Sequence, residues 1–327
     1  MDRLATTLCG IPLRNPVLAA SGTFGYGIEF AKLLDLNQIG GIVVKGLSRE
    51  PMAGNPPPRL WETAAGMMNS VGLQNIGVRA FVREKLPQLR GYRTAIIANV
   101  FGYAPEDYAE VIRTLEDAEG IAAYELNVSC PNTHAGGIFF SSDPALLSTL
   151  VRSLRPLARR PLIVKLSPNV SRIEPLALAA EEAGADAVSL VNTFIALAID
   201  AHTRRPHIGN GFGGLSGPAI KPIALRMVYE AAQAVRMPVI GLGGIRTGED
   251  AAEFLIAGAS AVQVGTMNFA DPRAPLRIAQ ELDRFLESER LASASDLVGS
   301  LQVNHEKDHI DTTSAESDRP VLPGRNS

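Results

Sequence analysis

Cys130 is one of only two cysteines in the chain, and its position suggests that its thiol takes part in a reaction. The segment AYELNVSCPNTHAGG, residues 123–137, places it at the end of an apolar, β-leaning run and just before a loop with proline, histidine and paired glycines. A cysteine that only filled a core would more comfortably lie inside the strand. A thiolate is a nucleophile and a proton acceptor, so a thiol at the start of a loop is a candidate catalytic group.

Polar side chains also stand at the ends of other apolar runs. They are three asparagines, two lysines and two hydroxyl residues: Ser21, Lys45, Asn99, Asn127, Lys165, Asn192 and Thr193. A single asparagine at a strand end is usually a turn former, so the interpretation depends on the repetition. Together, these amides and ammonium groups suit a planar ligand edged with carbonyls and ring nitrogens.

Three glycine-bearing segments later in the chain predict an anion site. They are GGLSGPAIKP (213–222), GLGGIRTGED (241–250) and VGTMN (264–268). Glycines before a helix let backbone N–H groups converge on an anion, which is the usual phosphate site of parallel α/β barrels. GLGGIRTG alone resembles a loose dinucleotide motif, but no acidic residue follows about twenty positions later to bind a ribose.

The two lysines leave one other reaction class open. Lys45 or Lys165 could attack a carbonyl as the Schiff-base lysine of a barrel aldolase. That alternative leaves Cys130 and the three asparagines without a role.

The elements that must position these residues alternate along the chain. Eight short apolar runs lie at 16–20, 41–46, 94–100, 123–128, 161–166, 187–192, 238–243 and 261–265, and amphipathic stretches such as 105–118 and 143–158 separate them. Eight buried strands, each followed by a helix, predict a single α/β (β/α)8 TIM barrel, whose active site lies at the carboxyl ends of the strands. A doubly wound sheet would place a dinucleotide fingerprint after its first strand, and SGTFGYG does not fit that pattern.

Two segments lie outside the predicted barrel. Residues 4–16, LATTLCGIPLRNP, are expected to form an N-terminal β-hairpin across the amino-terminal face of the barrel, which places Cys9 far from the site. The polar end of the chain has no periodic apolar face, so we expect a disordered C-terminal tail. The predicted domain organisation is one barrel domain over 1–303 and a tail over 304–327.

Composition and charge exclude several classes of function. Hydrophobic residues make up 46% of the chain, and 31 basic residues face 34 acidic ones, so no nucleic-acid partner is expected. No apolar run is long enough for a membrane span, and the N-terminus shows neither signal peptide nor presequence, so a cytoplasmic location is expected. The chain has only two cysteines, and its histidines are not spaced like metal ligands, so we expect no metal site. Any redox chemistry would therefore need an organic cofactor.

The ordered motifs resemble a known enzyme family. KGLS, NSVGLQNIG, ANVFG, ELNVSCPN, VKLSPN, VNTF, GGLSGPAIKPIALR, GLGGI and VQVGT are similar to the motif series of soluble class 1 dihydroorotate dehydrogenases, over about residues 4–303. The resemblance implies oxidation of (S)-dihydroorotate to orotate on FMN, a step of de novo pyrimidine (UMP) biosynthesis. A proton leaves C5 and a hydride leaves C6 in this reaction.

The resemblance also assigns residues. The implied FMN contacts are Ser21, Lys45, Gly46, Asn99, Asn127, Lys165, Val191, Gly217, Gly243, Gly244, Gly265 and Thr266. The implied substrate contacts are Lys45, Asn69, Ser70, Val71, Gly72, Leu73, Asn127, Asn192 and Thr193. Cys130 matches the catalytic base, and Lys165 is expected to place positive charge near N1 and O2 of the flavin.

Two features favour class 1B over the fumarate-reducing homodimers of class 1A. They are MMNSVGLQNIG at 67–77 and SDLVGSL at 295–301. Class 2 enzymes carry serine in place of the cysteine and an N-terminal extension, so the cysteine at 130 and the start of this sequence lead us to expect class 1. Class 1B implies a partner subunit with FAD and a [2Fe–2S] cluster that passes electrons to NAD+, in a heterotetramer with two copies of each chain. Class 1A remains the alternative.

Overall fold

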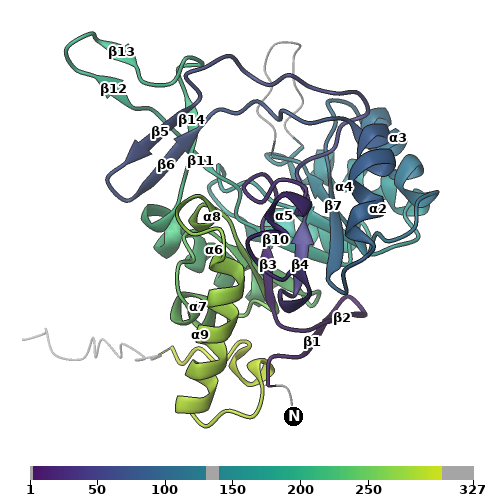
Figure 1. The fold of residues 1–327 in the computed structure, drawn as a ribbon, viewed down its shortest axis with the longest axis vertical. Helices are drawn as coiled ribbons and strands as arrows, with labels where there is room; N and C mark the ends of the chain where they lie inside the picture. Colours follow the sequence, from purple (N-terminus) through teal and green to yellow (C-terminus); the bar gives the residue numbers. More distant parts are fainter. Residues whose placement is uncertain (1–2, 130–139, 304–327) are drawn as a thin grey trace, which may run out of the picture.

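Eight parallel strands close into a barrel in the computed structural model, which describes residues 3–129 and 140–303 (Figure 1). The strands are β3 (Val17–Ala19), β4 (Gly41–Val43), β7 (Ala95–Val100), β8 (Ala123–Asn127), β9 (Leu162–Lys165), β10 (Ala187–Leu190), β15 (Val239–Leu242) and β16 (Ala261–Val264). Each one falls within a predicted apolar run. The order around the barrel is β10-β15-β16-β3-β4-β7-β8-β9, which confirms the predicted (β/α)8 fold.

Helices pack around the outside of the barrel. They are α1 (Val78–Ala80), a π-helical segment η3 (Phe81–Lys85), α2 (Leu86–Leu89), α3 (Pro105–Glu116), α4 (Pro144–Leu154), α5 (Glu174–Glu182), α6 (Lys221–Ala234), α7 (Gly248–Ile256), α8 (Met267–Ala270) and α9 (Ala274–Ser288). The sequence predicts a helix after every strand, and the connection from β3 to β4 departs from this. It contains two short 3-10 turns, η1 (Ile28–Phe30) and η2 (Leu36–Gln38), because three glycines at positive φ interrupt it: Gly22, Gly25 and Gly27.

The N-terminal hairpin closes one end of the barrel, as predicted. Strands β1 (Thr6–Leu8) and β2 (Ile11–Leu13) pair antiparallel, with Thr6 opposite Leu13. Leu8 and Leu13 belong to the same buried cluster as the inward-facing residues near the amino ends of the barrel strands. A second and larger cluster fills the space between the barrel and its helices. The hairpin therefore leaves the carboxyl ends of the strands as the open face.

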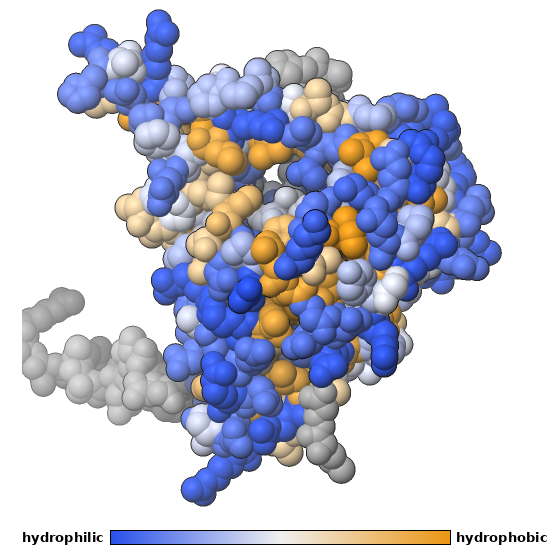
Figure 2. Space-filling view, in the orientation of Figure 1, coloured by the Kyte–Doolittle hydropathy of each residue, from blue (hydrophilic) through white to orange (hydrophobic). Residues whose placement is uncertain are grey.

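A second sheet rises over that open face, and the sequence did not reveal it. Its strands are β5 (Leu60–Thr63), β6 (Gly66–Asn69), β11 (Phe194–Ala196) and β14 (Gly213–Ser216), in the order β11-β14-β6-β5. They belong to the connections that follow β4 and β10, so the loops of two barrel strands form one platform. Figure 2 shows the surface hollowed below this sheet, with apolar side chains gathered around the opening.

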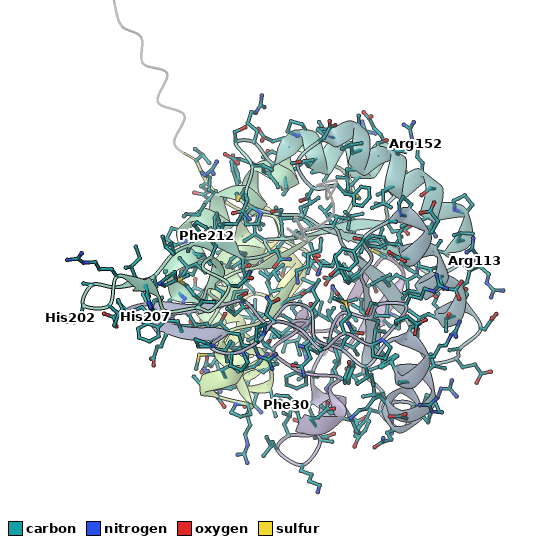
Figure 3. The ribbon with its side chains drawn as sticks, turned by 90° about the horizontal axis from the view of Figure 1, so that it is seen from above. Phe30, Arg113, Arg152, His202, His207 and Phe212 are labelled. Carbon is teal, nitrogen blue, oxygen red and sulfur yellow. The ribbon has the colours of Figure 1, made fainter. Side chains whose placement is uncertain are left out.

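A short hairpin, β12 (Ile199–Asp200) and β13 (Arg205–Pro206), projects beyond the platform. His202 and His207 lie at this projecting end in the view from above (Figure 3). The His207 ring stacks on Trp61 of β5 with ring centroids 3.5 Å apart, which joins the hairpin to the second sheet.

The remaining structural predictions concern the ends of the chain and membrane association. Residues 1–2, 130–139 and 304–327 lie outside the described part, so the predicted tail and the boundary at residue 303 stay predictions. Among the described residues, no helix has the length and apolar character to cross a membrane.

Candidate active site

The polar ends of the barrel strands meet across the mouth of the barrel. Lys165 ends β9, and Ser21 follows β3, which lies directly opposite β9 in the strand order. The Nζ atom of Lys165 is nevertheless within hydrogen-bond distance, 3.5 Å, of the Oγ atom of Ser21. Lys165 is only 5% exposed. Its ammonium group therefore spans the mouth and is shielded from water.

A buried carboxylate joins strands beneath the mouth. The side chain of Glu125 is fully buried, and its Oε1 accepts a 2.7 Å hydrogen bond from Nδ2 of Asn99 and lies 3.6 Å from Nζ of Lys165. Its Oε2 accepts hydrogen bonds from the hydroxyl of Ser189 at 2.9 Å and from Nε2 of Gln263 at 2.6 Å. Side chains from β7, β9, β10 and β16 thus converge on one residue of β8.

The sequence did not point to Glu125, Ser189 or Gln263 as site residues. Each is a polar residue inside an otherwise apolar run, in AYELNV, AVSLVN and AVQVG respectively. A polar side chain buried in a strand needs a hydrogen-bond partner, and neighbouring inward positions of other strands are the nearest source. A polar residue in the middle of each of three buried runs, before the strand end, is the signal that could have revealed this cluster.

The two asparagines at the ends of β8 and β10 lie side by side. Nδ2 of Asn192 donates to Oδ1 of Asn127 at 3.3 Å. The hydroxyl of Tyr108 donates to the backbone oxygen of Asn127 at 2.9 Å. Ser129 makes two hydrogen bonds at this strand end. Its N–H donates to Oδ1 of Asn127, and its Oγ donates to the backbone oxygen of Lys165.

Of the two cysteines, only Cys9 lies among the residues that the structure describes. Cys130, the predicted base, lies outside the described residues, and Ser129 is the last described residue before it. Cys9 lies in the turn of the N-terminal hairpin, where its Sγ donates to the backbone oxygen of Asp186 at 3.3 Å. Burial raises the pKa of Cys9 to about 11, and the charge of Asp186 contributes in the same direction. Cys9 is therefore a protonated structural thiol at neutral pH.

The glycine loops predicted to form an anion site approach each other closely. Gly217, Gly243 and Gly244 all have positive φ, and a Cβ on Gly244 would lie 2.9 Å from the backbone oxygen of Gly217. A capping box between Thr247 and Asp250 fixes the start of α7 just beyond this loop.

Backbone donors remain unused at the same loops. Within the described part of the chain, the N–H groups of Gly244 and Thr266 donate to no protein acceptor. Gly265 precedes Thr266, and among the described residues a Cβ on Gly265 would touch only Ala20, at 3.7 Å. The hydroxyl of Thr266 donates to Oγ of Ser216 at 2.8 Å, which ties this loop to β14. Free N–H groups on adjacent loops are what a bound phosphate requires.

Lys45 and Gly46 form the lip of β4. Burial lowers the pKa of Lys45, and the charge of Arg59 lowers it further. A Cβ on Gly46 would lie 2.9 Å from Oδ1 of Asn99, so only glycine leaves room for that oxygen. Oδ1 of Asn99 is buried and has no hydrogen-bond partner among the described residues. Because an unsatisfied buried acceptor is costly, a ligand that donates an N–H here would stabilise the site.

The stretch 69–73 lies beside the lips of β4 and β10. Asn69 pairs with Gly214 of β14, and its Nδ2 donates to the backbone oxygen of Gly214 at 3.4 Å. The Thr193 hydroxyl packs so closely on Gly214 that no Cβ would fit there. Buried Asn75 anchors the end of the stretch by donating to the backbone oxygen of Leu73 at 2.8 Å. The sequence did not single out Asn75 as a support.

Val191 and Gly243 complete the ring of predicted residues. The N–H of Val191 donates to the backbone oxygen of Leu242 at 2.9 Å. A Cβ on Gly243 would lie 3.4 Å from Cγ2 of Val191. The described residues that were predicted to bind cofactor or substrate therefore lie at the ends of the barrel strands or in the loops above them.

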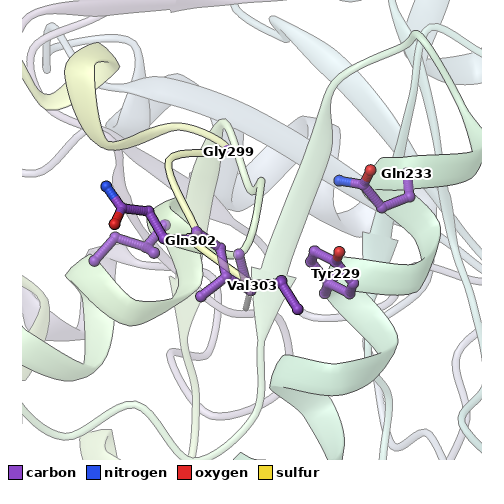
Figure 4. A pocket seen from close by; sticks show the side chains of 8 residues that line it. Tyr229, Gln233, Gly299, Gln302 and Val303 are labelled. Carbon is purple, nitrogen blue, oxygen red and sulfur yellow. The ribbon is translucent and has the colours of Figure 1, made fainter. Parts of the chain in front are cut away.

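A separate pocket of about 460 Å³ lies away from these strand ends (Figure 4). It is lined by Tyr229 and Gln233 near the carboxyl end of α6, by Ile256 and Ala257 at the end of α7, and by Gly299 and residues 301–303. Helices of this barrel run opposite to the strands, so this pocket belongs to the other face. It contains none of the predicted site residues.

Comparisons with known proteins agree with the geometry of the open face. The family described as dihydroorotate dehydrogenase matches residues 3–286. A protein of Solibacter usitatus, provisionally named dihydroorotate dehydrogenase A (fumarate), is 74% identical over 92% of this chain and 99% of its own length. A protein of Geobacter sulfurreducens named dihydroorotate dehydrogenase B (NAD(+)), catalytic subunit, is 53% identical over 92% of this chain and 98% of its own.

A solved structure supports the fold. The crystal structure of DHODH from Eimeria tenella, in complex with ferulenol, superposes with a TM-score of 0.79 and 21% identity, over 92% of this chain and 89% of the other. The similarity of the sequences over nearly the whole barrel identifies the enzyme class and decides against the aldolase alternative. The family implies the use of FMN. The chain belongs to the dihydroorotate dehydrogenase family.

Proposed function

We propose that this chain binds FMN at the open face of the barrel and oxidises (S)-dihydroorotate to orotate. The observation that carries the proposal is the polar mouth, where Lys165 reaches Ser21 across the barrel beside the unsatisfied Oδ1 of Asn99. Buried donors, acceptors and positive charge on one face suit the polar edge of an isoalloxazine ring. Among the described residues, Oδ1 of Asn99 has no hydrogen-bond partner, so it is free to accept from a ligand.

The residues divide between two ends of the cofactor. The phosphate would be held by backbone N–H groups of the loops that contain Gly217, Gly243, Gly244, Gly265 and Thr266, which donate to no acceptor among the described residues. The ring would be held by Ser21, Lys45, Gly46, Asn99, Asn127, Lys165 and Val191. When bound, FMN supplies a hydride acceptor for C6 of the substrate.

The substrate would lie between the cofactor and the second sheet. Asn127 and Asn192, which bond to each other, would donate to its ring carbonyls and carboxylate, with Thr193 and Lys45 beside them. The stretch of Asn69, Ser70, Val71, Gly72 and Leu73 would close over it. Cys130 would accept the proton from C5, and the preceding Ser129 already contacts Asn127 and Lys165.

We further propose that the electrons go to NAD+ through a partner subunit that carries FAD and a [2Fe–2S] cluster, in a heterotetramer. Relatives at 50–53% identity are named as catalytic subunits of an NAD(+)-linked enzyme, and the motifs at 67–77 and 295–301 agree with that class. The second candidate is fumarate as acceptor. The relative at 74% identity favours it.

The acceptor is tested with the isolated chain. Dihydroorotate oxidation is followed by the absorbance of orotate with an artificial dye, fumarate or NAD+ as acceptor. We expect turnover with the dye, none with NAD+ until the partner subunit is added, and none with fumarate. Rapid turnover with fumarate by the chain alone would support the second candidate. Direct reduction of NAD+ without a partner would contradict both.

A further inference from the structure

Among the described residues, Glu125 is the only carboxylate in the polar cluster under the mouth, and it is surrounded by donors. The amide of Asn99, the hydroxyl of Ser189 and the amide of Gln263 all donate to it, and the ammonium of Lys165 lies 3.6 Å away. It is 0% exposed. Burying a carboxylate costs free energy of desolvation, and hydrogen bonds from surrounding donors offset this cost. A buried polar cluster whose donors are all engaged is held rigidly.

This carboxylate determines which way the Asn99 amide faces. A carboxylate accepts hydrogen bonds, so the NH2 group of Asn99 must turn toward Glu125 and the carbonyl Oδ1 must turn away. Oδ1 then lies against Gly46, where a Cβ would be 2.9 Å from it, and it has no partner within the described residues. Glu125 thereby presents an acceptor, rather than a donor, at the lip of β4.

Glu125 also offsets the charge of Lys165. Two opposite charges 3.6 Å apart in a buried site interact strongly, and the anion reduces the positive potential that the ammonium exerts at the mouth. Reduction of a flavin adds negative charge. A less positive site therefore stabilises the reduced cofactor less.

We propose that Glu125 is a positioning residue that sets both the orientation of Asn99 and the reduction potential of the bound flavin. This inference rests on the proposed function, since it needs FMN at the mouth. Glu125 touches neither substrate nor cofactor in this account. It acts through Asn99 and Lys165.

The substitution Glu125→Gln isolates the charge. The new amide can keep its oxygen toward Asn99 and Lys165 and place its NH2 at the former Oε2 position. There, the Ser189 hydroxyl can rotate and the Gln263 amide can flip, so that both become acceptors. Among the described residues, Oε1 of Gln263 is buried without a partner, so that flip breaks no hydrogen bond of this oxygen. The shape of the cluster is then kept while one negative charge is lost.

The test measures the midpoint potential of the purified yellow protein by equilibration with redox dyes, together with the FMN dissociation constant. We expect Glu125→Gln to favour the reduced flavin at least tenfold, an upward shift of about 30 mV for a two-electron couple. Glu125→Asp, which keeps the charge but withdraws it from Asn99, should weaken FMN binding about tenfold. Ser189→Ala removes one donor and no charge, so its potential should equal that of the wild type.

The outcomes separate the two proposals. A wild-type chain that binds no FMN overturns the proposed function and this inference together. A yellow wild-type chain whose potential is unchanged by Glu125→Gln overturns only the inference. A Glu125→Gln chain that does not fold also overturns it, because the carboxylate would then be needed for folding rather than for tuning.

Discussion

The ammonium of Lys165 lies 3.5 Å from the hydroxyl of Ser21, although these residues are 144 positions apart and stand on opposite strands of the barrel. The long side chain of Lys165 brings one positive charge to the centre of the barrel mouth. Solvent would screen the field of an exposed lysine much more strongly. The buried carboxylate of Glu125 holds this ammonium from below. The central charge of the proposed flavin site is thus fixed by residues from three strands.

The first prediction concerns Cys130 as the base. Cys130→Ser should reduce dihydroorotate oxidation near neutral pH by about 10²- to 10⁴-fold, the usual contribution of a general base, because a serine hydroxyl is a far weaker acid than a thiol. Activity should recover in part as the pH rises, and FMN should stay bound. The rate of flavin reduction under anaerobic conditions, measured against pH, checks this.

Cys9→Ser is the matched control. The pKa of Cys9 is raised to about 11, so its thiol is protonated throughout the assay range and its loss should leave the pH profile unchanged. Full activity of the Cys130 variant at neutral pH would remove the thiol from the mechanism.

The second prediction concerns the phosphate loops. Gly244→Ala should weaken FMN binding at least tenfold, because its φ is +82° and the new Cβ would lie 2.8 Å from Cβ of Lys221 and 2.9 Å from the oxygen of Gly217. Quenching of FMN fluorescence on titration gives the dissociation constant. Gly91→Ala, at an open surface position, should bind FMN as the wild type does. Equal affinity in the two variants would place the phosphate elsewhere.

The third prediction concerns Asn75, which supports the substrate stretch. Its Oδ1 accepts from the N–H of Gly77 and from Ser48, and its Nδ2 donates to Leu73. Asn75→Ala leaves these buried groups unpaired and should cost about 1–3 kcal/mol of unfolding free energy. Asn75→Asp keeps the acceptors and loses the donor, so it should lose less stability and still raise the KM for dihydroorotate. An unchanged KM in the Asp variant would show that Leu73 needs no such anchor.

The fourth prediction concerns Lys45 and stability. Burial and Arg59 lower the pKa of Lys45 in the folded chain, so the unfolded chain binds the proton more tightly. The flavin-free protein is therefore destabilised by this lysine at neutral pH, and the penalty decreases as the pH rises through the lowered pKa toward the unfolded value. Lys45→Met should unfold at a higher temperature than the wild type at neutral pH, while binding FMN less tightly. A lower melting temperature for Lys45→Met than for the wild type would contradict the predicted destabilisation by this lysine.

The barrel could be predicted because its strands are local features. Runs such as GIVVKG and PLIVKL are short, β-branched and apolar on both faces, and helical patterns separate them. The platform of β5, β6, β11 and β14 could not be predicted, because Gly214 pairs with Asn69 across 145 positions and neither strand has an apolar alternation. Strand pairing between two long loops leaves no periodic trace in either one.

The site was predicted in part for a similar reason. Lys165, Asn99 and Asn127 stand at strand ends, where a polar residue is conspicuous. Glu125 stands two residues deeper, and its partners are up to 138 positions away, so only the closed barrel shows that they meet. The orientation of the Asn99 amide follows from its contact with Glu125, so the sequence around Asn99 could not predict it.

The most direct test of the account is anaerobic mixing of the purified chain with (S)-dihydroorotate, followed by the visible absorbance of the flavin and by orotate formation. We predict a yellow protein with noncovalent FMN whose absorbance bleaches on mixing, with one equivalent of orotate formed for each flavin reduced. A colourless chain that takes up no FMN on reconstitution, or bound FMN that stays oxidised with saturating dihydroorotate, would contradict the account.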